Sequence, residues 1–331
     1  MLPMRALILA LAVGAFGLAP TVRAQPAAAS MAPAPGSFLR AADHRIVSIV
    51  YRLGLAGRAL CPEPFPLTGL AFHHLAEYRP ADRADAIARW GIDRGPGILS
   101  VVEGSPAARA GLAAGDVLLS VDGTPFPSAT AIAAESDPDR WRPRTVASEE
   151  LLENRLRAGP VRLEIVRAGR PLAVTLGAVP ACPARGRLAR SGQDNAFADG
   201  RYVIMTTGFL GFFRTDDELA VALAHELSHN ILRHPQQLLA QGVPQSGIMR
   251  NIGRNARLVR ATEVEADRLS VRLLAAAGYD LDAIIPFWRR LYGRADAILQ
   301  IISAHPGLRA RERIIGEVLA EIRGSPPAQA R

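Results

Sequence analysis

The run TDDELAVALAHELSHN, residues 215–230, decides the fold of the second half of this 331-residue chain. Thr215, followed by Glu218 three positions later, is typical of a helix N-terminus that is capped by these two side chains. The apolar residues that come next continue the helix through the HELSH segment. His225 and His229 are therefore four residues apart on one helix, and we expect their imidazoles to project from the same face.

Two imidazoles at this spacing can share one tetrahedral zinc ion, and Glu226 beside them can reach a water molecule at the metal. The alternative is a pair of structural histidines on an exposed helix. The segment EVEAD, residues 263–267, argues against that alternative, because it lies in a second run of helical spacing and carries Glu263 and Asp267 at i and i+4. One carboxylate can complete a set of three protein ligands, while the other accepts a hydrogen bond from an imidazole. Glu265 is expected to be solvated.

These motifs resemble those of the CAAX-prenyl-protease/HtpX-like gluzincin family of zinc endopeptidases. The resemblance covers about residues 201–315 and rests on TDDELA leading into AHELSHN, EVEAD, AGYD at 277–280, and SAHP at 303–306 with Arg311 behind it. It implies that Glu263 is the third zinc ligand, beside His225 and His229. The membrane-embedded members have several spanning helices and this chain has none after its first residues, so processing of prenylated proteins is not carried over.

The expected ligand set leads to a mechanism for peptide hydrolysis. Glu226 takes a proton from the water molecule as general base and later passes it to the leaving amine. His305 is the candidate for stabilising the oxyanion, and the alternative is that it packs structurally beside Pro306. His234 is interpreted as a helix-end residue near the negative end of the helix dipole.

The surroundings of the metal site carry two further expectations. Arg311 pairs with Asp267 or with a substrate carbonyl, and its neighbours Arg309 and Arg313 leave open which arginine supports the site. Residues 201–207 are predicted to form a strand, and in the resembling enzymes such a strand is the edge on which the substrate backbone lies antiparallel.

The region before the peptidase motifs changes to short strands and tight turns. It contains GSPAARAGL at 104–112 and GDVLLSVDG at 115–123, which resemble a PDZ domain of the bacterial envelope-protease type. PDZ domains bind an extended peptide by adding it to a sheet edge, often through its C-terminal carboxylate. The resemblance implies that Gly97, Ile98 and Leu99 form the carboxylate loop and the edge strand, opposite a helix at 148–157. The alternative is a module that packs structurally and binds no free peptide.

The first residues have the three parts of a secretory signal peptide. Arg5 precedes the apolar run Ala6 to Leu18, and small residues flank an expected cleavage site after Ala24. The run is shorter than the roughly 20 residues that span a bilayer. We therefore predict an exported, periplasmic protein with no integral membrane segment after cleavage; the alternative is a short anchor that stays attached.

Cysteine content and charge agree with this interpretation. Cys61 and Cys182 are an even pair in an exported chain and are predicted to form one disulfide, with two unpaired buried thiols as the alternative. The net charge of +8 comes from arginines scattered along the chain, with no lysine. Because they form no stripe interleaved with aromatic residues, we expect no nucleic-acid partner.

The predicted fold class is α+β: a mainly helical gluzincin metallopeptidase domain with a small edge sheet, preceded by a PDZ-like β-rich domain. The predicted function is a zinc endopeptidase of the bacterial envelope that cuts exported, misfolded polypeptides, with the PDZ recruiting or regulating. A PDZ adaptor or chaperone-like protein with a silent zinc site, and a zinc hydrolase of non-peptide substrates, are the rivals. The predicted divisions are a signal peptide at 1–24, a tether and helical segment at 25–90, the PDZ-like domain at 91–180 and the peptidase domain at 183–325.

Overall fold

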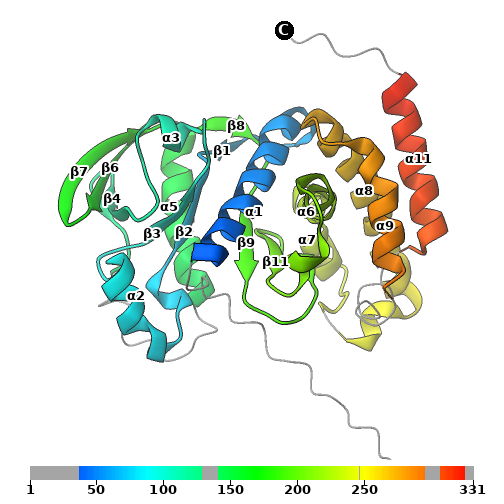
Figure 1. Ribbon diagram of the computed structural model, residues 1–331, viewed down its shortest axis with the longest axis horizontal. Helices are drawn as coiled ribbons and strands as arrows, with labels where there is room; N and C mark the ends of the chain where they lie inside the picture. Colours follow the sequence, from blue (N-terminus) through cyan, green and yellow to red (C-terminus); the bar gives the residue numbers. More distant parts are fainter. Residues whose placement is uncertain (1–36, 129–140, 246, 295–305, 325–331) are drawn as a thin grey trace, which may run out of the picture.

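The computed structural model describes residues 37–128, 141–245, 247–294 and 306–324. It places a β-rich lobe beside a mainly helical lobe, with the long helix α1 between them (Figure 1). This arrangement confirms the predicted α+β class, with a PDZ-like β-rich part ahead of a helical peptidase part. No helix within the described ranges is long and apolar enough to cross a membrane.

The helical lobe is built around α6, whose buried side chains belong to one hydrophobic core with those of the neighbouring helices. Ile46, Val50 and Leu53 of α1 are fully buried and join the same hydrophobic core as α6. The predicted helical segment before residue 60 therefore belongs to this core. The helices of the lobe are α1 (Ser37–Ala56), α6 (Asp216–Ile231), α7 (His234–Ala240), α8 (Gly253–Ala276), α9 (Ile284–Tyr292) and α11 (Leu308–Gly324).

A small sheet lies against α6 and has the order β10-β11-β9. Its strands are β9 (Gly186–Ala189), β10 (Ala196–Ala198) and β11 (Val203–Thr206). β11 pairs parallel with β9 and antiparallel with β10, so it lies in the middle of the sheet. The predicted strand at 201–207 is therefore present, but the expectation that it forms the edge is wrong. β10 is the outer strand on the side of α6.

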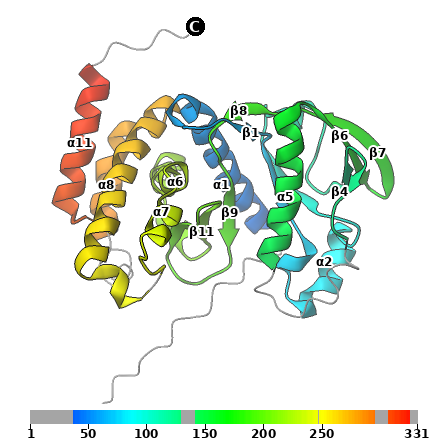
Figure 2. The same cartoon turned by 180° about the vertical axis from the view of Figure 1, so that it is seen from behind.

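The β-rich lobe contains a second sheet, of order β2-β3-β4-β6-β7, with β5 paired to β4. The strands β6 and β7 form an antiparallel hairpin. Seen from behind, α5 runs beside this sheet on the side of α1 and β9 (Figure 2). The elements are β2 (Leu70–His73), α2 (Arg83–Trp90), β3 (Gly97–Val101), α3 (Pro106–Arg109), β4 (Val117–Val121), β5 (Thr124–Pro125), α5 (Trp141–Ala158), β6 (Val161–Arg167) and β7 (Arg170–Leu176).

The neighbour of β3 corrects a prediction from the sequence. β2 pairs antiparallel with β3, and His73 lies opposite Gly97. A Cβ atom on Gly97 would come within 2.4 Å of the His73 ring, so this glycine leaves room for the neighbouring strand. Gly97, Ile98 and Leu99 therefore lie in an inner strand and not at a sheet edge, and the sheet begins at Leu70, before the predicted boundary at residue 91.

A short two-stranded sheet and a disulfide join the two lobes. β1 (Phe65–Leu67) pairs with β8 (Val179–Ala181). Cys61 and Cys182, 121 residues apart, are bonded next to this sheet, in agreement with the predicted pair. The segment between them contains the whole β-rich lobe, so the crosslink closes that lobe at its base. Single 3-10 turns occur at Gly57–Leu60, Leu75–Glu77, Pro80–Asp82, Phe209–Phe212, Ile248–Asn251 and Leu281–Ala283.

Candidate metal centre

The helix that carries HELSH begins where its capping residues predict. The Thr215 hydroxyl accepts a hydrogen bond from the Glu218 backbone N–H at 3.2 Å. The Glu218 carboxylate accepts the backbone N–H of Arg214, one residue before the cap, and also binds Arg290 of α9 at 2.6 Å. The glutamate therefore caps the helix and ties its first turn to α9.

Three side chains from α6 and α8 converge as the ligand prediction requires. His225 Nε2 lies 3.3 Å from His229 Nε2 and 3.2 Å from Glu263 Oε2, and His229 Nε2 lies 3.5 Å from Glu263 Oε1. A tetrahedral ion with bonds of about 2.0–2.1 Å has ligand atoms about 3.3–3.4 Å apart. The spacing of these three donors therefore fits one zinc ion and leaves a fourth position open. Glu263 faces this site, whereas Glu265 does not belong to it.

Asp267 and Arg311 lie behind His225, on the side of its Nδ1 atom. Asp267 Oδ1 lies 3.0 Å from His225 Nδ1, and Asp267 Oδ2 accepts from Arg311 Nε at 2.9 Å. The Arg311 guanidinium is fully buried and stacks over Trp288, 3.9 Å from its ring centroid. Burial lowers the pKa of His225, but the hydrogen bonds with Asp267 and Glu263 outweigh it and raise that pKa to about 9.

The position of Arg311 resolves a choice that the sequence leaves open. Arg309 and Arg313 are exposed, and Arg313 approaches Glu317 on the surface of the same helix. Arg311 is on the buried face of α11, where it reaches Asp267 of α8. His305, the predicted oxyanion residue, lies outside the described residues, as do its immediate predecessors.

Glu226 lies beside the ligands and faces the small sheet. Burial raises its pKa to about 7, and a hydrogen bond from the backbone N–H of Ala198 opposes that rise. Ala198 is the last residue of β10, the outer strand. Glu226 is thus held next to β10, an outer strand of this sheet among the described residues.

Family models match both lobes of the chain. One described as peptidase family M48 matches residues 165–254 and 251–317, and one described as a PDZ domain matches residues 97–134. Residues 165–317 therefore match peptidase family M48. The M48 match contains every metal-site residue placed above, and the PDZ match begins at the first residue of β3.

Relatives of this chain carry peptidase names. Two are named mitochondrial metalloendopeptidase OMA1: the protein of Schizosaccharomyces pombe is 30% identical over 153 residues, 40% of this chain and 45% of the relative, and that of Arabidopsis thaliana is 26% identical over 136 residues, 35% and 27%. A putative beta-barrel assembly-enhancing protease of Vibrio cholerae is 29% identical over 150 residues, 36% and 31%. The chain spans less than half the length of each of these relatives.

The position of His234 differs from the prediction. His234 is not at the end of α6 but begins α7, after a left-handed turn at Arg233 with φ of 56°. Its ring is buried and contacts both His229 and Glu265. The spacing of this histidine, five residues after the second ligand, was the available signal, but no helix continues to it, so helical periodicity could not place it.

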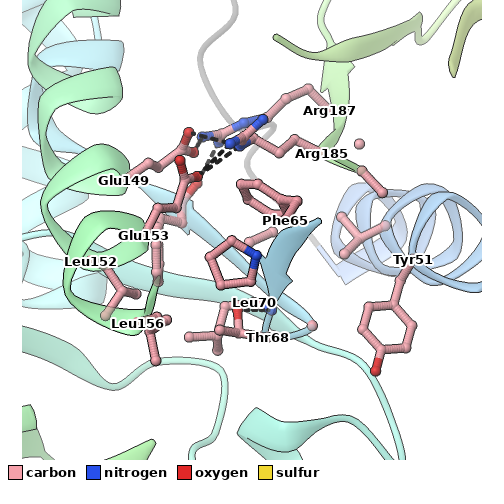
Figure 3. Close-up of a pocket in the computed structure, with 17 residues that line it drawn as sticks. Tyr51, Phe65, Thr68, Leu70, Glu149, Leu152, Glu153, Leu156, Arg185 and Arg187 are labelled. Atoms are coloured by element: carbon pink, nitrogen blue, oxygen red, sulfur yellow. Dashed lines mark hydrogen bonds and ion pairs between the residues drawn. The ribbon is translucent and has the colours of Figure 1, made fainter. Parts of the chain in front are cut away.

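A narrow cavity lies where β2 and α5 of the β-rich lobe meet α1 and β9 (Figure 3). It holds about 50 Å³ between the outer edge of β2 and α5, enough for a few water molecules. α1 and the start of β9 close it from the other side. The labelled residues around it are Tyr51, Phe65, Thr68, Leu70, Glu149, Leu152, Glu153, Leu156, Arg185 and Arg187.

Arginines of the M48 region bridge this cavity. Arg187 Nη2 binds Glu149 at 2.9 Å and Arg185 Nη2 binds Glu153 at 2.7 Å, both across to α5 (Figure 3). Arg187 Nη1 also donates to the backbone oxygen of Phe72 in β2. Burial raises the pKa of Glu149, but the cations, led by Arg187, outweigh it and lower that pKa below its ordinary value.

Proposed function

We propose that this chain is a zinc-dependent endopeptidase that cuts exported polypeptides in the bacterial cell envelope. The observation that carries the proposal is the convergence of His225, His229 and Glu263 at tetrahedral spacing, with Glu226 beside them. Family M48 and the metalloendopeptidase names of the relatives support the reaction class. The Vibrio cholerae relative supports an envelope protein.

The side chains of the site have separate roles in this reaction. His225, His229 and Glu263 would hold a zinc ion, which polarises a carbonyl and makes water more acidic when bound. Glu226 accepts the proton of the attacking water and delivers it to the leaving amine. The edge of β10 aligns the substrate as an additional antiparallel strand, since Ala198 places this edge against Glu226. Asp267 holds the ring of His225, and Arg311 holds Asp267.

The test is Glu226→Gln, which keeps the size of the side chain and removes its basicity. We expect cleavage of casein to fall by at least about 100-fold, since general bases contribute about 10²–10⁴-fold. Zinc content, measured by elemental analysis, should stay at one ion per chain. If the wild-type protein contains zinc and cleaves casein, and Glu226→Gln cleaves casein equally well, the role of Glu226 is refuted. Wild-type protein without zinc, or normal zinc in His225→Ala, would refute the metal site.

The same assay separates the rival functions. A PDZ adaptor with a silent zinc site binds polypeptides and cleaves none of them. A hydrolase of non-peptide substrates leaves casein intact but loses its own activity in Glu226→Gln. Substrate trapping with Glu226→Gln in the native compartment, followed by mass spectrometry, identifies which chains are retained.

Export is the second part of the proposal. Cleavage after Ala24 would release the mature chain into the periplasm, where a disulfide such as Cys61–Cys182 persists. The mass of the protein recovered from a periplasmic fraction tests this directly. A chain that begins at Met1, or that stays with the membrane, would contradict it.

In the PDZ-like lobe, the strand proposed to bind a peptide is β2, because β3 is an inner strand. The outer edge of β2, between the Thr68–Gly69 turn and α5, is the edge to which a peptide would add. Arg187 and α1 cover it in this conformation, so a C-terminal peptide has to displace contacts with the M48 region. Peptide binding is thereby coupled to how the lobes pack, which supports a regulatory role for the PDZ.

A further inference from the structure

His229, the second candidate zinc ligand, has a hydrogen-bonding partner at its Nδ1 atom, as His225, the first candidate, does. His225 turns its Nε2 toward the ligand cluster and its Nδ1 toward Asp267, 3.0 Å away. His229 likewise turns Nε2 toward the cluster, and its Nδ1 lies 3.0 Å from Nδ1 of His234. Both rings therefore present Nε2 to the proposed metal position, and the Nδ1 atom of each lies within hydrogen-bonding distance of a buried side chain.

His234 is held in this position from both sides. Its side chain is 1% exposed, and its Nε2 lies 3.1 Å from Glu265 Oε2. The left-handed turn at Arg233 brings the chain back against α6, so that the ring lies beside His229 and under α8. Pro235 follows as the second residue of α7, where a missing N–H does no harm.

The hydrogen bonds admit one consistent placement of protons. A His229 ring that offers the lone pair of Nε2 to a cation carries its proton on Nδ1. The facing nitrogen of His234 must then accept, which puts the His234 proton on Nε2. There it donates to Glu265, whose carboxylate can only accept. A proton on Nδ1 of His234 instead would set two N–H groups against each other.

We propose that His234 and Glu265 are positioning residues for the second zinc ligand, His229, as Asp267 is for His225. This inference rests on the proposed zinc site. Partners of this kind fix the tautomer and orientation of a ligating imidazole and raise its basicity, and their loss commonly weakens metal binding 10- to 100-fold. A buried histidine that serves packing alone supports the fold but does not change zinc affinity.

The experiment measures the zinc dissociation constant of the full chain by competition with a chromophoric chelator. We expect His234→Ala to weaken zinc binding by about 10- to 100-fold. His234→Gln keeps an amide oxygen that can accept from Nδ1 of His229, and should recover most of this loss. Glu265→Gln, at an exposed carboxylate, should weaken binding less than His234→Ala. The matched control is His73→Gln, which removes a buried histidine bonded to Tyr78 in the other lobe and should leave zinc affinity unchanged.

A second readout reports geometry. In the cobalt(II)-substituted protein, the visible absorption bands should shift in His234→Ala and return toward wild type in His234→Gln. The unfolding midpoint of the metal-free protein shows how much each substitution affects the fold itself. If His234→Ala does not fold, the comparison of His234→Gln with Glu265→Gln carries the test.

Wild-type zinc affinity and an unchanged cobalt spectrum in His234→Ala, or in Glu265→Gln where the alanine variant does not fold, would overturn the inference. That outcome leaves the proposed function intact as long as wild type binds zinc and His225→Ala does not. Wild-type protein that binds no zinc overturns the proposed metal site, and the positioning inference with it.

Discussion

Replacing Arg187 by methionine removes the central cation between the two lobes. Its guanidinium, 6% exposed, binds Glu149 at 2.9 Å and lies 3.6 Å from Glu77. It also donates to the backbone oxygen of Phe72, on the strand edge that we assign to the peptide. Methionine keeps most of the apolar stem, so the change isolates the loss of the charge and its hydrogen bonds.

The expected cost follows from burial. Removing one partner of a buried ion pair costs about 3–5 kcal/mol, because the other charge stays behind in a poorly solvated site. Here two carboxylates remain, and burial has already raised the pKa of Glu77 to about 7. The matched control, Arg268→Met, breaks an exposed pair with Glu317 and should cost less than about 1 kcal/mol.

The same contacts hold the edge of β2 closed. A peptide that binds only the open form has its apparent affinity reduced by the open fraction. Loss of about 3 kcal/mol from the closed form therefore raises that affinity by up to about 100-fold, at 1.4 kcal/mol for each factor of ten. Arg268→Met, which lies far from this edge in the fold, should leave it unchanged.

Urea denaturation followed by tryptophan fluorescence measures the first effect, in metal-free wild type and both variants. Fluorescence anisotropy with a labelled decapeptide ending in three apolar residues and a free carboxylate measures the second, with the amide-capped peptide as control. The reasoning is refuted if Arg187→Met has the same free energy of unfolding as Arg268→Met. It is refuted for the closed edge alone if Arg187→Met is destabilised but binds the peptide no better than wild type.

Three further predictions follow from buried groups. Asp267→Asn places an amide N–H group or a weaker acceptor against His225 and should weaken zinc binding at least about 10-fold in chelator competition; unchanged affinity contradicts the support role. Burial raises the pKa of Asp43 to about 7, above its value in the unfolded chain, so the wild-type protein loses stability as pH rises from about 4 to 7. The free energy of unfolding of Asp43→Asn should therefore rise by about 3 kcal/mol relative to that of wild type between pH 5 and pH 8. If the urea midpoints of the two proteins shift equally over this range, the prediction is contradicted. The double change of Cys61 and Cys182 to serine opens a 121-residue separation and should lower the free energy of unfolding by about 4–5 kcal/mol, whereas adding a reductant to the double variant should change nothing.

Much of the metal site is local in sequence, and for that reason it could be predicted. The cap at Thr215 and the spacing of His225 and His229 depend on one helix, whose geometry is set within a few residues. Glu263 and Asp267 share a second helix, so their relative placement also follows from spacing. Which of the acidic residues faces His225 and His229 required the resemblance, because the two helices are separate elements and can meet in many rotations; His225 and Glu263 are 38 positions apart.

The strand edges and the interface between the lobes could not be predicted in this way. The residues at Gly97 to Leu99 form a strand as expected, but whether that strand is an edge depends on where Leu70 to His73 goes. The contact of Arg187 with Phe72 joins residues 115 positions apart, and an arginine in a strand pattern carries no sign of its partner. Strand order and long-range ion pairs are decided when the chain is packed as a whole.

By itself, the sequence determined the chemistry of this protein: two histidines and a glutamate on one helix, carboxylates on another, and a module with PDZ motifs. The physical reason is that helix periodicity and capping act over one or two turns and are written in neighbouring residues. Only the tertiary structure decided that Arg311 is the arginine bonded to Asp267, that β10 and β2 are outer strands of their sheets in the described part of the chain, and that the His234 ring contacts His229. Each of these depends on side chains from separate elements meeting in a shared core, where burial and the full satisfaction of hydrogen bonds select one arrangement.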